Sequence, residues 1–168
     1  METKTTAWLT TITFSLIGIW TFFYRAPIVP ELLPQTIFYA VLVLNTFFSI
    51  RFYAKIQPKN VSQATIDVIL VLTYIVLGLS LGRPVAFVFA ALCLFIAAPI
   101  KYMLMLGLIP YEALLKRKIL IDSQGTALCA LVLAGTLAGY AFASAWAFAI
   151  LFTLANVYLL LIRPMYRL

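Results

Sequence analysis

The chain has 168 residues, of which 65% are apolar and only 10% are charged. A water-soluble domain is roughly 45–50% apolar and about 25% charged, so this sequence has too little polar surface to cover a globule in water. Histidine is absent, which excludes Ser-His-Asp and Cys-His catalysis and every histidine-ligated haem or metal site. The net charge of +7 comes from basic residues beside apolar segments, which indicates membrane topology and no nucleic-acid partner.

Six runs are each long and apolar enough for a membrane-spanning helix, which needs about 20 residues. In chain order they cover residues 7–24, 36–53, 61–81, 85–108, 125–142 and 146–162. The uncharged stretch 125–162 is too long for one span, because a single helix there would be about 57 Å long against a hydrocarbon core of ~30 Å. We expect a turn in it near Ala143-Ser144-Ala145. The predicted fold is a single-domain, all-α, polytopic transmembrane helix bundle.

The distribution of basic residues predicts the orientation of these spans. Six spans place both termini on one side, and that side would hold ten of the twelve basic residues, against only Arg25 and Arg83 on the other. The ten are Lys4, Arg51, Lys55, Lys59, Lys101, Lys116, Arg117, Lys118, Arg163 and Arg167. Cytoplasmic loops carry the excess of lysine and arginine. We therefore expect both termini in the cytoplasm (N-in, C-in) and a protein integral to a prokaryotic inner membrane.

Two polar connections carry further signals. Asn60 precedes the third run and is followed three residues later by Gln63, as in a helix capping box. Asp122 or Ser123 is expected to cap the fifth helix.

Residues 110–122 form the longest polar stretch, and 110–120 is a candidate interfacial helix. Glu112 can pair with Lys116 four residues on. Lys116, Arg117 and Lys118 would then contact anionic lipid headgroups at the cytoplasmic rim. In the alternative interpretation, the stretch is a positively charged loop that only sets topology.

Charged side chains at membrane depth are expensive and normally face the protein interior, so each one is a functional hypothesis. Asp67 lies about two turns inside the third run, on a polar or small stripe with Gln63 and Tyr74. Lys101 lies about two turns inside the fourth run, on a stripe of small residues. Because these runs are antiparallel neighbours, Asp67 and Lys101 lie at similar depth, and we expect them to pair.

Two asparagines extend this site. Asn45 on the second run and Asn156 on the sixth are predicted to join Asp67, Tyr74 and Lys101 in a polar interior cluster. Such a cluster is a candidate site for a solute or an ion. In the alternative interpretation, these groups only bond one another and hold the helices together.

The predicted function is transport or binding of a small solute, ion or lipid at this cluster. The alternative is a non-catalytic subunit or lipid-organising protein acting through helix contacts, for which Gly135 and Gly139 offer a close-packing spacing. Its partners would be membrane lipids, further copies of the chain or another membrane subunit. Enzyme activity is not favoured, because the acids are scattered and no nucleophile motif is present. No cofactor or metal is expected.

Overall fold

The computed structural model describes residues 3–24, 26–163 and 165 of the chain, and within these residues it is entirely helical. Its elements are α1 Thr3–Tyr24, α2 Leu32–Tyr53, α3 Val61–Leu79, α4 Pro84–Met103, α5 Glu112–Leu137 and α6 Ala141–Val157, which continues into the π-helical turn η1 Tyr158–Ile162. By length and composition, six helices are able to cross a membrane when α6 and η1 are taken together. The predicted all-α bundle of six long apolar helices is confirmed.

The helices pack as a closed ring of neighbours, in the order α1, α3, α4, α5, α6, α2 and back to α1. Each therefore buries two flanks and leaves an outer face, which carries large apolar side chains. On α1 the outward residues include Trp8, Ile12, Leu16, Ile19 and Phe23. A contiguous apolar surface of this kind is suited to lipid and not to water.

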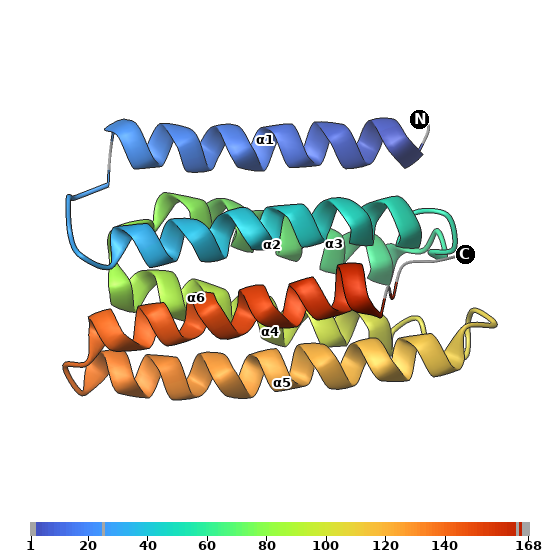
Figure 1. Ribbon diagram of the computed structural model, residues 1–168. Coiled ribbons are helices and arrows are strands. Elements are labelled where there is room, and N and C mark those ends of the chain that lie inside the picture. The colour runs from blue at the N-terminus through green and yellow to red at the C-terminus, as the bar shows by residue number, and fades with distance from the viewer. Residues whose placement is uncertain (1–2, 25, 164, 166–168) are drawn as a thin grey trace.

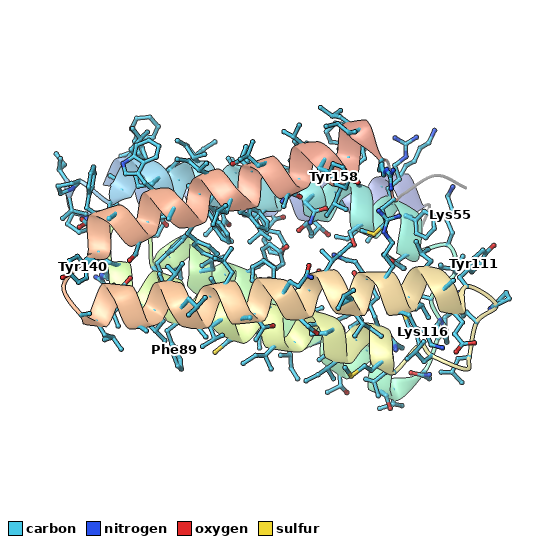
Figure 2. All side chains as sticks on the ribbon, turned by 60° about the horizontal axis from the view of Figure 1, so that its bottom comes forward. Lys55, Phe89, Tyr111, Lys116, Tyr140 and Tyr158 are labelled. Carbon is cyan, nitrogen blue, oxygen red and sulfur yellow. The ribbon has the colours of Figure 1, made fainter. Side chains whose placement is uncertain are left out.

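The two ends of the bundle differ in which connections they hold (Figure 1). We call the end at which α1 begins and η1 ends the terminal end, and the opposite end, with the α1–α2, α3–α4 and α5–α6 connections, the hairpin end. Figure 2 shows Lys55, Tyr111 and Lys116 at the terminal end and Tyr140 at the hairpin end. The two halves of the bundle are named after these ends.

Five phenylalanines fill the interior of the hairpin half, and we call them the aromatic core: Phe38, Phe87, Phe95, Phe148 and Phe152. Phe38 on α2 is fully buried at their centre. Its ring lies 4.1 Å from that of Phe148 and 4.5 Å from that of Phe152, both on α6. On its other side it meets Phe87 of α4 edge-on, at 5.7 Å between ring centroids. Offset and edge-to-face contacts of this kind are the favourable geometries for aromatic pairs.

A buried glutamine closes the hairpin end. Gln35 lies in the first turn of α2, which begins four residues earlier than the predicted span, and the Gly82 N–H donates to its side-chain oxygen at 2.7 Å. Gly82 ends the α3–α4 turn with a φ of +78°, where a side chain is strained. A Cβ there would also lie 2.7 Å from Cδ of Pro27 in the α1–α2 connection. Only glycine fits this contact between two connections.

Exposed threonines satisfy their own hydroxyl groups along the helices. Thr13, Thr65 and Thr73 each donate to the carbonyl four residues earlier, at 2.7 to 3.0 Å. An unsatisfied hydroxyl is costly in an apolar environment, and this back-bond removes that cost without a partner helix.

The predicted boundaries after α4 were wrong. Glu112–Leu137 forms one continuous helix, so there is neither a separate interfacial helix at 110–120 nor a new helix capped by Asp122 or Ser123. The physical reason is that Lys118 and Asp122 neutralise each other inside the bundle, so these charges do not mark the end of an apolar run. Likewise α4 ends at Met103 and not at 108, which places Lys101 in its last turn.

The turn between the last two helices was also misplaced. It falls at Ala138–Tyr140, where Gly139 has a φ of +90°, and residues 143–145 lie within α6. Glycine just after a helix C-terminus in this conformation is a common helix stop. Because Gly139 is in the turn, it forms no helix-packing motif with Gly135.

Candidate functional site

A cavity of about 270 Å³ lies inside the terminal half of the bundle. Its lining comes from the beginning of α1, the end of α2, the beginning of α3, the end of α4 and the beginning of α5. Apolar side chains such as Phe14, Leu94 and Phe95 form much of the wall, and Phe95 also belongs to the aromatic core. Two lysine–carboxylate pairs interrupt this apolar wall, and each is described in turn below.

The first pair, which we call the outer pair, joins Asp67 of α3 to Lys101 of α4, with 2.6 Å between Lys101 Nζ and Asp67 Oδ1. The predicted pairing of these residues is confirmed. The side chain of Lys101 is 14% exposed and that of Asp67 is 39% exposed. Gln57, in the α2–α3 connection, donates from Nε2 to Asp67 Oδ2 at 2.7 Å. Both carboxylate oxygens of the outer pair therefore have partners.

The first turn of α3 positions Asp67. Asn60 accepts a hydrogen bond from the Gln63 N–H at 2.8 Å, so the predicted N-cap is confirmed. The Gln63 side chain, predicted to complete a capping box, donates to the Lys101 carbonyl at 3.4 Å. This contact joins the beginning of α3 to the end of α4 and holds the two members of the outer pair in register.

The second pair, which we call the inner pair, joins Lys118 and Asp122 one turn apart on α5, with 2.6 Å between Lys118 Nζ and Asp122 Oδ1. Each side chain is only 6% exposed. The Lys118 ammonium also lies 5.5 Å from the centre of the Tyr102 ring, within the range of a cation–π contact. Asp122 Oδ2 is buried and has no hydrogen-bond partner among the described residues. An unsatisfied buried acceptor costs about 1–3 kcal/mol, and more when it is charged.

A third ion pair, also on α5, has the same spacing as the inner pair but is exposed to solvent. Lys116 and Glu112 are also four residues and 2.6 Å apart, but their side chains are 66% and 63% exposed. This predicted pair is confirmed. The prediction that Lys118 contacts lipid headgroups is wrong, because its side chain is buried and paired. Lys116 and Arg117 are exposed.

Tyr74 and Asn45 line the same cavity as the two pairs. The Tyr74 hydroxyl is hydrogen-bonded to the Thr46 hydroxyl, and the Tyr74 ring stacks on Phe14 at 4.6 Å. The Thr46 hydroxyl also donates to the Leu42 carbonyl at 2.8 Å. These contacts fix Tyr74 against α1 and α2.

Asn156 does not join this group. It lies on α6, which contributes none of the described lining residues, and its Nδ2 donates to the Phe152 carbonyl at 2.9 Å. The structure thus brings together Asn45, Asp67, Tyr74 and Lys101, and the placement of Asn156 with them was wrong. α6 lies between α5 and α2 in the ring and meets α4 through Phe152 and Phe95 of the aromatic core.

Among the members of the two pairs and their hydrogen-bond partners, the sequence analysis did not assign Gln57, Lys118 and Asp122 to the cavity. The spacing of Lys118 and Asp122 was an available signal, because it equals the spacing that predicted the Glu112–Lys116 pair. Both were instead assigned to a polar stretch outside the membrane. Gln57 carries no such signal, since its role depends on how the connection folds back to α3.

No group of three or more histidine, cysteine or acidic side chains in the described part of the chain is placed to hold a metal ion. Comparison of the chain with protein-family models, curated proteins and solved structures finds no match. The chemistry that the site itself offers is charge, hydrogen bonding and apolar contact, which are the means of binding a small molecule.

Proposed function

We propose that this chain is an integral membrane protein that binds a small solute in the cavity between the outer and inner pairs and exchanges it with the cytoplasmic side. The observation that carries the proposal is the cavity itself, which two lysine–aspartate pairs line in a bundle whose outer faces are apolar. Charges inside such a bundle are expensive, and each is by default a hypothesis of a binding site or a pathway.

The orientation is part of the proposal. The terminal end carries the basic excess, including Lys55, Lys59, Lys116 and Arg117, and basic residues concentrate on the cytoplasmic side of membrane proteins. We therefore place both termini in the cytoplasm, and the protein in a prokaryotic inner membrane. Exposed Lys116 and Arg117 would attract anionic headgroups there, at about 1 kcal/mol per basic residue.

The size and lining of the cavity restrict the size and the polarity of the solute that it can hold. About 270 Å³ holds about nine water molecules at ~30 Å³ each and lies just below the ~300–1,000 Å³ of pockets for drug-sized ligands. The solute is therefore small. The lining combines aromatic and aliphatic side chains with a few fixed polar groups, which suits an amphipathic molecule better than a bare ion.

Native mass spectrometry of the protein released from lipid nanodiscs tests this function. We expect a stoichiometric small-molecule adduct on the wild-type chain, and its loss when a phenylalanine fills the cavity in Ala98→Phe, since Ala98 lines the wall. The control Phe89→Ala changes an outward-facing ring and should keep the adduct. An adduct that persists in Ala98→Phe would refute the proposal. A co-purified second membrane protein without any small molecule would instead support a subunit role.

A further inference from the structure

The outer and inner pairs differ in whether the second carboxylate oxygen of the aspartate has a hydrogen-bond partner. In the outer pair, Lys101 and Gln57 occupy both oxygens of Asp67. In the inner pair, Lys118 occupies Asp122 Oδ1, while Oδ2 is buried without a partner among the described residues. Asp122 also lines the cavity. A buried carboxylate oxygen that lacks a donor, on a residue that lines a cavity, is a point at which a ligand can donate a hydrogen bond.

The charges of the wall restrict what the donor can be. The charged residues among the described lining are two lysines and two aspartates, and they are already paired. A cationic ligand would leave one uncompensated positive charge in a poorly solvated interior. An anionic ligand would face the free oxygen of Asp122. The best fit is an uncharged donor, such as a hydroxyl or an amide N–H.

The surroundings of Asp122 indicate what the rest of the ligand contacts. Thr126, one turn further along α5, donates to the Phe95 carbonyl of α4 at 2.6 Å and to the Asp122 carbonyl at 3.1 Å. This brings Phe95 next to the inner pair, and the Phe95 ring lies over Gly125, where a Cβ would be 2.4 Å from the ring. With Leu94 and Phe14, Phe95 gives the same cavity an apolar surface.

We propose that the cavity binds an uncharged amphipathic molecule whose hydroxyl or amide hydrogen is donated to Asp122 Oδ2 and whose hydrocarbon part packs on Phe14, Leu94 and Phe95. This inference rests on the proposed function, because it names the class of solute for the same cavity. It assigns to Asp122 the recognition of the polar group and to the aromatic wall the recognition of the hydrocarbon.

The test compares four probes of eight carbons: 1-octanol, its methyl ether, octylammonium and octanoate. Each is titrated into the wild-type protein in nanodiscs, and bound probe is counted by native mass spectrometry. We expect 1-octanol to bind at one per chain and about tenfold more tightly than the ether, the size of one hydrogen bond to a charged acceptor. Infrared difference spectra should show a shifted carboxylate band when the alcohol binds and no shift with the ether.

A double variant and a matched control test the role of the inner pair in this binding. The double variant Lys118→Met with Asp122→Leu replaces the pair by apolar side chains of similar size, a change that buried ion pairs often tolerate. It should bind the alcohol and the ether equally and lose the infrared shift. The matched control, Glu112→Gln with Lys116→Gln, changes the exposed pair with the same spacing on the same helix and should behave as wild type.

Three results would overturn the inference. The first is tighter binding of octylammonium or octanoate than of 1-octanol. The second is a preference for the alcohol that survives in the Lys118→Met, Asp122→Leu variant. The third is equal binding of alcohol and ether to the wild type, with loss of both in Ala98→Phe. That result would keep the cavity as a binding site but would remove the role of Asp122. If no probe binds the wild type at all, the inference fails together with the proposed function.

Discussion

The hairpin half and the terminal half of the bundle fill their interiors in different ways. In the hairpin half, the ring of Phe38 is fully buried among other aromatic rings, and the Gln35–Gly82 hydrogen bond closes the end. In the terminal half, a cavity of about 270 Å³ separates the helices, and lysine–carboxylate pairs line it. Aromatic rings fill the centre of the hairpin half, and the pocket of about 370 Å³ between α1 and α2 there has no charged residue among its described lining, whereas two ion pairs line the cavity of the terminal half.

The largest effect should come from breaking the inner pair on one side only. Lys118→Met leaves Asp122 buried without its cation, and removal of one partner from a buried pair costs about 3–5 kcal/mol. The double variant Lys118→Met with Asp122→Leu should recover most of that loss. Unfolding free energies in mixed micelles measure both. Equal destabilisation by the single and the double variant would show that the terminal half depends on side-chain packing, as the hairpin half does.

Removal of the central ring of the hairpin half should have the next largest effect. Phe38→Ala costs about 3–5 kcal/mol in a water-soluble core. In a bilayer, lipid is as apolar as the protein interior, so only the packing part is lost, and we expect about 2–3 kcal/mol.

The control for this variant is Phe89→Ala, since Phe89 lies on the outer surface (Figure 2). It should leave the unfolding free energy nearly unchanged. A similar loss in both variants would contradict a core centred on Phe38.

Alanine substitutions at two glycines with nearly equal φ angles allow the hairpin end and the terminal end to be compared directly. Gly82 at the hairpin end and Gly107 at the terminal end have φ of +78° and +77°. Alanine at either position carries a backbone cost of about 1–2 kcal/mol. At Gly82 the new Cβ also meets Pro27, whereas nothing lies within 4 Å at Gly107. Gly82→Ala should therefore lower the unfolding free energy by more than Gly107→Ala, and an equal loss would mean that the contact between the connections is loose.

The smallest effect should come from the exposed pair of α5. Glu112→Gln with Lys116→Gln should not measurably change the unfolding free energy, because solvent screens exposed ion pairs. Its binding of anionic vesicles should change little, because the variant removes one negative and one positive charge, and should weaken when Arg117→Gln is added. A measurable loss of stability in the pair variant would indicate that this surface is covered in the assembled protein.

The sequence was most informative where charge and helical period agreed. Asp67 and Lys101 stand on separate apolar runs at matching depth, so their pairing could be predicted. Lys118 and Asp122 were missed because each is an acceptable loop residue, and only the fold shows that they compensate each other inside α5. The position of the last turn failed for a similar reason: Gly139 was assigned to helix packing, although glycine also ends helices. The position of Asn156 depends on which helices α6 contacts in the folded bundle, and the lengths of the apolar runs do not predict those contacts.

The hydrogen bond from Gln57 to Asp67 makes the α2–α3 connection a reporter of the cavity. Lys55 is exposed two residues before Gln57 (Figure 2), so a fluorescent label at position 55 would lie outside the bundle on the segment that holds the outer carboxylate. Any occupant that displaces Asp67 or Lys101 would then change the emission of a dye that it never touches. A label at this position would allow compound libraries to be screened for binding to the cavity in real time.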